Sequence, residues 1–259
     1  MNRLTKNLLL TLGMCALVSL QASAAGKKEK VNPIFDNYFK TPTEAVATPD
    51  ADGFIRRWNL LEPIGKPNRS NTVFTDSYIR EQFAMPYFEN QMTIIPEDGQ
   101  KVKAMVEVQI VDPKAAPTNR FSMEPPKIEQ QKASLVWHAL DSKLFNVKLF
   151  RFADCYYKEH YNAIFWAVTV INCEEDMEVR LAVGSNSASQ WWLNGEEVLI
   201  LSNDRRMVMD DCVSKRITLK KGKNVLRGAV INGPGMSDFC ARFLDEAGNP
   251  VRNISVSFK

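Results

Sequence analysis

Residues 184–198 read GSNSASQWWLNGEEV, and Trp191-Trp192-Leu193-Asn194-Gly195 within them decides the fold. Asn-Gly between two β-prone segments is the strongest short hairpin signal, because both turn positions need positive φ and these two residue types tolerate it. The tryptophans are therefore predicted to lie on a strand. The serines before them fit three readings: a nucleophile loop, a sugar-stacking platform or an ordinary hairpin.

Short apolar segments alternate with turn signals on both sides of this hairpin, from Gly53 to the end of the sequence. Examples are SLVWHAL, FNVKLFRF, AIFWAVTVI and NVLRGAVI. Since no long helical pattern separates them, the chain is predicted to be an all-β sandwich or barrel in a single domain. One short helix is expected in SYIREQFAMPYF, which Pro86 interrupts, and a long polar loop is expected over residues 112–132.

The first residues have the pattern of a secretory signal peptide. Arg3 and Lys6 precede an apolar run from residue 8 to residue 20, and Ala22-Ser23-Ala24 follows as a cleavage site. The run is shorter than the roughly 20 residues that span a bilayer. We therefore expect a signal peptide over 1–24, a tether over 25–52, a β-sandwich domain over 53–259, and a secreted protein in the periplasm or at the cell surface without a membrane span.

Charge and cysteine content exclude several classes of protein. Removing residues 1–24 lowers Lys plus Arg from 33 to 31 against 30 Asp plus Glu, which leaves a net charge of +1. Such a chain lacks the basic stripe that nucleic-acid binding requires. The four remaining cysteines match no zinc or redox motif, and export permits disulfides, so their pairing stays open. They are Cys155, Cys173, Cys212 and Cys240.

Two further stretches carry a resemblance to a known family. MEVRLAVGSNSASQWWLNGEEV and LKKGKNVLRGAVING follow each other in the order that resembles the galactose-binding-like jelly-roll modules of bacterial polysaccharide-degrading systems. The stretches GFIRRWNLLEPI, NRSNTVFTDSY and RRMVMDDCVSKR are similar to exported Bacteroidetes proteins labelled acetylxylan esterase. The first resemblance implies a jelly-roll β-sandwich, and the second implies a xylan-type substrate. Neither resemblance establishes a catalytic activity, because the name of an enzyme can also be given to the non-catalytic module that accompanies it.

A catalytic site is not favoured by the residues. GSNSAS lacks the G-x-S-x-G pattern of a nucleophile elbow, and the chain has only two histidines. His138 lies in a strand-like run and reads as a structural histidine. The least unfavourable triad is Ser187, with Ser189 as its alternative, together with His160 and Asp154. We therefore expect no catalytic residues.

A sugar-binding face is the preferred interpretation. Since successive strand residues point to opposite faces, Trp191 is assigned to the core and Trp192 to a polar surface or cleft. An aromatic ring flanked by amides suits a pyranose, although both rings packing between sheets is the plain structural alternative. The predicted ligand-binding residues are Trp192, Gln190, Asn194, Asn186, Arg205, Arg206, Asp210 and Asn232, with the loop from Asn232 to Asp238 at the same end.

No cofactor is predicted. Asp210-Asp211 beside Arg205-Arg206 has oxygen ligands that suit Ca²⁺, but a surface ion-pair cluster is the favoured reading. The sequence as a whole predicts a secreted, non-catalytic accessory protein that binds a polysaccharide or oligosaccharide of the xylan type. An esterase acting on acetylated xylan and a module that docks onto an enzyme through the Trp192 face are the alternatives.

Overall fold

A computed structural model describes residues 30–67, 74–110, 127–233 and 235–259. The predicted signal peptide lies outside these residues. Helices α1, α2 and α3 span Phe35–Tyr38, Asp76–Ala84 and Leu149–Cys155. The strands are β1 Phe39–Lys40, β2 Val46–Ala47, β3 Arg57–Leu61, β4 Ile64–Gly65, β5 Lys101–Gln109, β6 Ile128–Ser142, β7 Ala163–Cys173, β8 Met177–Ser185, β9 Ala188–Leu193, β10 Glu196–Leu201, β11 Cys212–Val213, β12 Ile217–Leu219, β13 Gly222–Asn232, β14 Phe239–Leu244 and β15 Ser255–Ser257.

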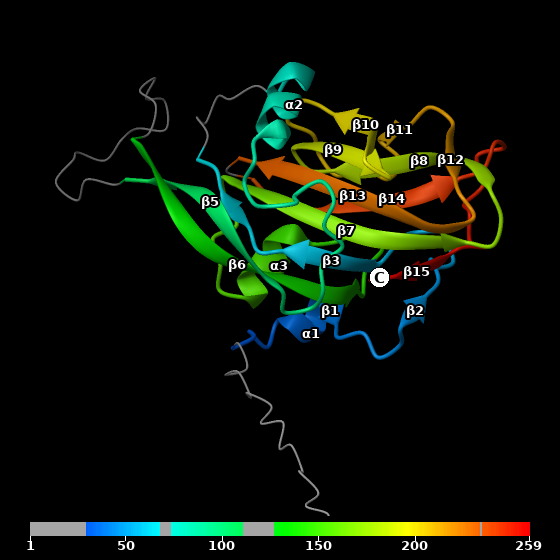
Figure 1. Cartoon of the computed structure of the whole chain (residues 1–259), viewed down its shortest axis with the longest axis horizontal. Coiled ribbons are helices and arrows are strands. Elements are labelled where there is room, and N and C mark those ends of the chain that lie inside the picture. Colours follow the sequence, from blue (N-terminus) through cyan, green and yellow to red (C-terminus); the bar gives the residue numbers. More distant parts are fainter. Residues whose placement is uncertain (1–29, 68–73, 111–126, 234) are drawn as a thin grey trace, which may run out of the picture. The chain divides into compact units, whose positions relative to one another are not determined.

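The strands form two antiparallel sheets (Figure 1). The large sheet runs β1-β6-β3-β7-β13-β9-β10, with β2, β4, β5 and β15 attached at its sides. In the small sheet, β8 pairs with β11, β12 and β14. From β7 onward the chain passes repeatedly between the two sheets, which is the path of a jelly roll. The predicted all-β sandwich class is confirmed.

The main core lies between the two sheets. Trp191 of β9 is fully buried there and packs edge-on against Trp58 of β3 and Phe239 of β14, with ring centroids 6.0 and 5.2 Å apart. Its indole Nε1 donates to Ser189 Oγ over 3.0 Å. The predicted core position of Trp191 is therefore confirmed, and its one polar atom has a partner.

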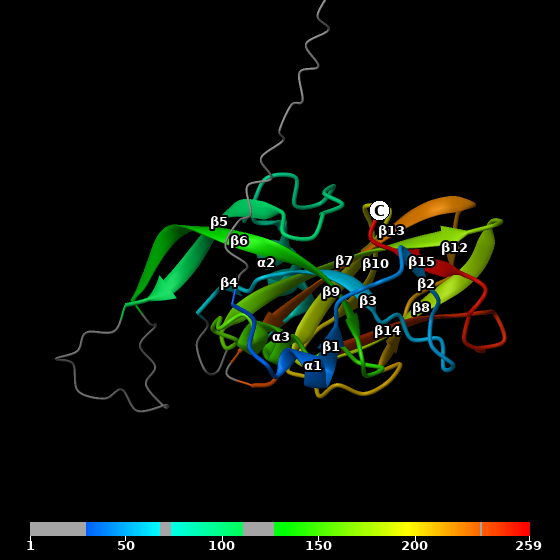
Figure 2. The same ribbon diagram turned by 90° about the horizontal axis from the view of Figure 1, so that it is seen from below.

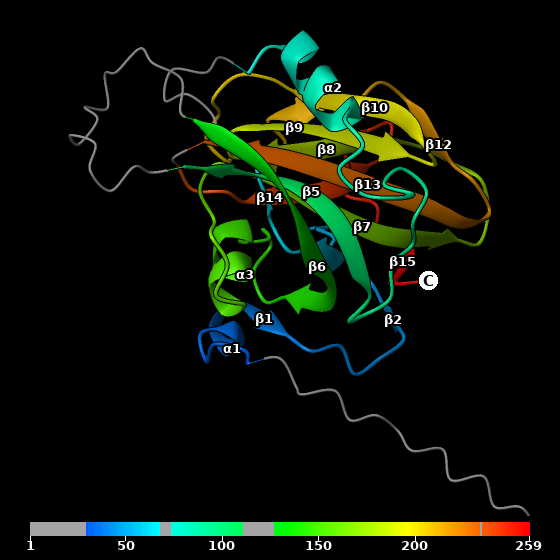
Figure 3. The ribbon, with the colours of Figure 1, turned by 60° about the vertical axis from the view of Figure 1, so that its left-hand side comes forward.

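The outer face of the large sheet has a second apolar cluster, and Trp192 belongs to it. Its ring stacks on Trp166, with centroids 5.8 Å apart, and meets Phe83 of α2 edge-on. The expectation of a polar surface at Trp192 is wrong, because the side chain is only 7% exposed. Alternation along the strand correctly sends the two tryptophans to opposite faces, but α2 and the residues after it cover the second face (Figure 3).

Helix α2 forms where SYIREQFAMPYF predicted a short helix. Thr75 caps it by accepting a hydrogen bond from the backbone N–H of Tyr78, and the helix ends two residues before Pro86. Its buried residues Ile79, Gln82 and Phe83 recur at three- and four-residue spacing and face the sheet. None of the helices among the described residues is long and apolar enough to cross a membrane.

The Asn194-Gly195 turn has the predicted geometry, with φ of 52° and 88°. Both positions are left-handed, as a type I′ hairpin turn requires. Asn194 also joins the turn to the next strand of the sheet: its Oδ1 accepts from the N–H of Val225 over 2.8 Å, and its Nδ2 donates to Asn224 Oδ1 over 3.0 Å. The amide of Asn194 therefore has a structural role.

Three boundaries differ from the sequence-based expectation. The compact unit begins at Val31, and residues 31–52 supply α1, β1 and β2 rather than a tether, with Phe39 fully buried in the main core. Residues 128–132 of the expected polar loop extend β6, which forms a long hairpin with β5 (Figure 2). In FNVKLFRF, an expected strand, residues 149–152 start α3, because Leu149, Phe152 and Ala153 bury one helical face.

Candidate functional site

One end of the sandwich gathers polar side chains from several loops and strand ends. This end lies where β8 ends, β9 begins, β13 ends and β14 begins. We call the following six residues the end cluster: Asp154, His160, Asn186, Ser187, Asn232 and Asp238. Hydrogen bonds link them into two groups, one around His160 and one around Asp238. The end cluster unites all three residues of the alternative triad with two of the predicted ligand-binding residues.

The first group is built on the imidazole of His160. Its Nδ1 lies 2.8 Å from Asp154 Oδ1, and the same carboxylate receives Arg151 Nη1 at 3.2 Å on its other oxygen. The Tyr161 ring packs edge-on against the imidazole at a centroid distance of 4.2 Å and is 45% exposed. An imidazole held by a carboxylate thus lies beside an aromatic ring that faces solvent.

Ser187 joins this group through Asn232. Its Oγ donates to Asn232 Oδ1 over 3.2 Å, and Asn232 Nδ2 donates to the carbonyl oxygens of His160 and Gly235. Ser187 is 4% exposed and has a φ of 55°, a left-handed conformation that is uncommon for a non-glycine residue. In the described part of the chain its hydroxyl contacts Asn232 and not the imidazole, so the three residues lie close together without forming a nucleophile–base hydrogen bond.

The second group surrounds the carboxylate of Asp238, which is 3% exposed. Oδ2 accepts from Asn146 Nδ2 at 3.0 Å and from Lys148 Nζ at 2.5 Å, and Oδ1 accepts from Asn186 Nδ2 at 3.1 Å. Asn186 Oδ1 in turn accepts from the N–H of Met207. The buried charge of Asp238 is thus paired and hydrogen-bonded, which holds Asn186 and Lys148 in fixed orientations at the rim of the cluster.

A buried hydroxyl beside this group has no partner. Ser237 is fully buried, and its Oγ has no hydrogen bond with any described residue.

Of the remaining predicted site residues, Arg205 lies beside the end cluster, where its carbonyl oxygen accepts from the N–H of Ser187 over 2.9 Å, and Gln190 and Asn194 lie elsewhere. Gln190 lies on the covered outer face with Trp192, donating from Nε2 to Glu197 Oε2 at 2.6 Å, and Asn194 lies at the opposite end of β9 from Asn186. The covered face also removes the surface on which the protein-docking alternative depended. Arg206 is exposed, in the loop after β10. The predicted ligand-binding residues therefore do not form one continuous surface.

The acidic pair near the arginines forms ion pairs. Arg205 Nε lies 2.6 Å from Asp211 Oδ2, and Arg242 Nε lies 3.0 Å from Asp210 Oδ1, while the second Arg242 contact goes from Nη2 to Oδ2 of the same carboxylate. Each carboxylate thus has an arginine partner. No group of three His, Cys, Asp or Glu side chains suited to a metal ion occurs within the described ranges.

His138 is buried in a separate cluster. Its ring stacks on Tyr156 at 3.7 Å, and its Nε2 lies 3.7 Å from Oε1 of Glu62. Lys158 Nζ lies 2.9 Å from the same oxygen, and the N–H of Val136 donates to Oε2. Burial raises the pKa of Glu62, but the nearby imidazole of His138, the ammonium group of Lys158 and the hydrogen bond from Val136 outweigh it and lower the pKa below its usual range. The structural reading of His138 agrees with this placement.

Sequence reasoning missed Tyr161, Lys148 and Asn146 at the end cluster. The segment YYKEHYNAIFW holds three tyrosines around His160, which was a usable signal for an aromatic surface beside the start of β7. Lys148 and Asn146 carried no such signal, because their role depends on Asp238, more than 80 residues away in sequence.

The four cysteines in the described residues are free thiols, and all but Cys212 are buried. Burial raises the pKa of Cys155 to about 12 and that of Cys240 to about 11. Deeply buried thiols with raised pKa values are poor nucleophiles and poor metal ligands. The three buried cysteines, Cys155, Cys173 and Cys240, therefore offer no reactive site in the part of the chain that the structure describes.

Comparisons with known proteins gave structural similarity only. No protein-family model matches the chain, and no curated protein matches it. A PA14 sugar-binding domain from an RTX adhesin superposes with a TM-score of 0.40 at 8% identity, covering 76% of this chain and 95% of that domain. The PA14 domain of the MpAFP antifreeze protein gives 0.38 at 9% identity, with 84% and 95% covered. A β-glucosidase from Kluyveromyces marxianus gives 0.30 at 20% identity, over 45% of this chain and 12% of the enzyme.

Proposed function

We propose that this protein is a non-catalytic carbohydrate-binding protein of a polysaccharide-utilisation system, exported by the signal peptide over 1–24, and that its glycan is of the xylan type. The observation that carries the proposal is the Tyr161 ring, which is 45% exposed and packs against His160 at the rim of the end cluster. An exposed aromatic ring stacks on the C–H face of a pyranose, while nearby donors and acceptors bond its hydroxyls.

The polar groups around Tyr161 are of the kind that sugar hydroxyls need. His160, Asn186 and Lys148 are each partly exposed while being held from behind by Asp154 or Asp238. Side chains that are fixed before binding lose little rotamer freedom on binding, so they favour affinity.

Calorimetry with neutral xylo-oligosaccharides tests the proposal. Tyr161→Ala is expected to lower affinity by about tenfold or more, since stacked aromatic contacts contribute on the order of 1 kcal/mol or more beyond the area they bury. Tyr157→Ala is the matched control, because Tyr157 is an exposed tyrosine of the same segment. Equal losses in both variants, or no binding by the wild-type protein to any neutral glycan, would contradict the proposal.

The esterase alternative has one observation in its favour, the 2.8 Å contact between Asp154 and His160. In a serine esterase the imidazole must accept the proton of the nucleophile, and here the Ser187 hydroxyl is bonded to Asn232 instead. A p-nitrophenyl acetate assay with Ser187→Ala and His160→Ala separates the two functions. Acetate release by the wild-type protein that both variants abolish would replace the binding proposal.

Export is tested separately from binding. Mass spectrometry of the protein recovered from its cells is expected to find a chain that begins at residue 25. Recovery of the full-length chain from the cytoplasm would contradict this part of the proposal and leave the glycan-binding part to the calorimetry.

A further inference from the structure

A second hollow lies away from the end cluster, beside β1, β2 and the start of β3. It has a volume of about 220 Å³. Four of its lining residues are cationic and one is acidic: Lys40, Arg56, Arg57, Lys143 and Asp141. We call it the cationic pocket. Its size is below the roughly 300 Å³ at which drug-sized pockets begin, and so it suits a ligand of about one sugar residue.

The single acid of the pocket is already neutralised. Asp141 accepts from Arg57 Nε on Oδ1 at 2.8 Å and from Arg57 Nη2 on Oδ2 at 3.0 Å, both within the protein interior. The third nitrogen of the same guanidinium donates to the carbonyl oxygen of Glu44. This bidentate pair is complete, so Arg57 and Asp141 form a wall of the pocket without net charge.

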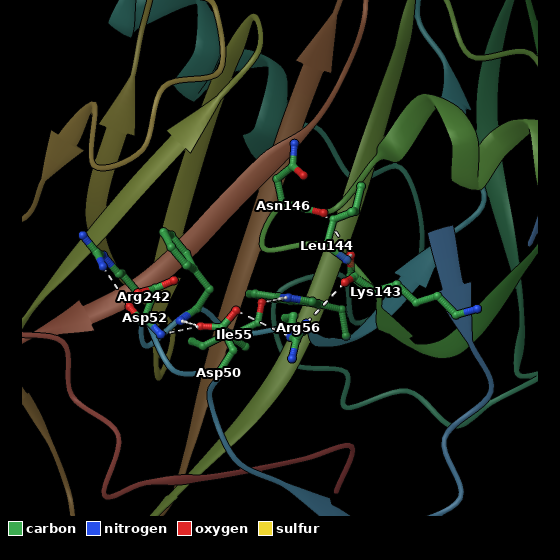
Figure 4. A network of polar contacts seen from close by, with 11 residues as sticks. Asp50, Asp52, Ile55, Arg56, Lys143, Leu144, Asn146 and Arg242 are labelled. Carbon is green, nitrogen blue, oxygen red and sulfur yellow. Dashed lines mark hydrogen bonds and ion pairs between the residues drawn. The ribbon is translucent and has the colours of Figure 1, made fainter. Parts of the chain in front are cut away.

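Within the described ranges, the other three cations have one acidic partner between them, Asp50, which pairs with Arg56. Arg56 Nε lies 3.6 Å from an Asp50 oxygen, and its Nη1 donates to the carbonyl oxygen of Lys143 (Figure 4). Lys143 Nζ donates to a neutral carbonyl, that of Asp36. Lys40 has no ion-pair partner among the residues that the structure describes. An anion bound here would supply a counter-charge to Lys40 and Lys143 and a second one to Arg56.

The rest of the lining suits the body of a sugar. Ala47 is the partly exposed apolar residue of the lining, where β2 pairs with β15, and Thr48 is exposed beside it. An inorganic anion needs no apolar wall, whereas a pyranose ring presents C–H groups to one.

We propose that the cationic pocket binds a sugar residue that carries a carboxylate, that is, a uronate. The carboxylate lies among Lys40, Arg56 and Lys143, and the ring lies against Ala47 and Thr48. The choice of a sugar as carrier rests on the proposed function, whereas the choice of an anion rests on the pocket alone.

The test is an amide NMR titration of the protein with glucuronate, glucose and inorganic phosphate. Glucuronate is expected to shift the amides of Ala47, Thr48, Ser142 and Val256, with an affinity that falls as salt is added. Glucose at the same concentration is expected to leave them unshifted, and phosphate to bind more weakly than glucuronate. Lys40→Gln and Arg56→Gln are each expected to weaken glucuronate binding by about tenfold. Lys103→Gln, an exposed lysine of β5, is the control and is expected to have no effect.

Three results would overturn the inference: glucuronate that shifts none of these amides, glucose that shifts them equally, or phosphate that displaces glucuronate with equal or higher affinity. Neutral xylo-oligosaccharides are titrated in parallel and read at the amides around Tyr161. If the protein binds glucuronate but no neutral xylo-oligosaccharide, the result contradicts the proposed function alone. The reverse result contradicts the uronate inference alone.

Discussion

Gly228 of β13 lies directly against the ring of Trp191, so closely that a Cβ atom at this position would be 2.5 Å from Cζ3 of the indole. The two residues are register partners on neighbouring strands of the large sheet. The ring cannot move aside, because Trp58 and Phe239 pack against it.

Gly228→Ala is therefore expected to destabilise the protein by about 1–3 kcal/mol through overpacking of the main core. Gly233→Ala is the matched control, since an added Cβ there meets no atom within 4 Å. Urea denaturation measures both variants. Equal stability of Gly228→Ala and the wild type would show that the Trp191 ring is not fixed as described.

Truncating Trp192 is expected to cost about 3–5 kcal/mol of unfolding free energy, in the same range as truncating Trp191. The reason is the burial of both rings in separate apolar clusters on opposite faces of the same sheet. Thermal and urea unfolding of Trp191→Ala and Trp192→Ala check this. A Trp192→Ala variant within about 0.5 kcal/mol of the wild type would mean that α2 does not cover this face in solution.

Removing the ammonium group near Glu62 is expected to produce a pH-dependent loss of stability. Lys158→Met leaves a buried carboxylate with fewer donors, at a cost of about 1–3 kcal/mol at neutral pH. Because the folded pKa of Glu62 is lowered, its stabilising contribution is complete above the unfolded pKa of about 4.3 and is lost as pH falls through the folded pKa.

The difference between wild type and Lys158→Met should thus be constant above about pH 5 and should shrink in more acidic solution. Lys132→Met, at an exposed position of β6, provides the control for loss of one positive charge. A difference that is constant down to about pH 3 would show that Lys158 acts through packing alone.

Gly195→Val is expected to cost about 1–3 kcal/mol, because the native φ of 88° is strained for a β-branched residue. No atom lies within 4 Å of the added Cβ, so the effect is one of backbone strain and not of a clash. The measurement is the melting temperature of Gly195→Val beside that of Gly195→Asn, which tolerates this conformation better. Equal melting temperatures would contradict the type I′ turn.

The fold class and the hairpin were accessible from sequence because their signals are local. Strand alternation sends Trp191 and Trp192 to opposite faces, and Asn194-Gly195 specifies its own turn. The burial of Trp192 was not accessible, since it depends on how α2, more than 100 residues earlier, packs across the sheet. Local patterns predict the direction of a side chain and not what covers it.

The residues of the end cluster could be grouped only in part from the sequence. Asn186, Asn232 and Asp238 were grouped from loop position alone, and the structure connects Asn186 to Asp238 directly. Arg57 could not be assigned from sequence, because its partner Asp141 is 84 positions away. Long-range charge pairing leaves no periodic signature in a single sequence.

The pairing of β2 with β15 has a mechanical consequence. Val46 lies opposite Ser257 and Ala47 opposite Val256, so the segment leading into β2 and the segment leaving β15 emerge at the same end of the pair. A pulling force applied to these two segments opens the contact one residue pair at a time, like a zipper, instead of shearing all its bonds together. Under tension, the short β2–β15 pair is thus expected to open first, while the longer strand pairs of the sandwich stay intact.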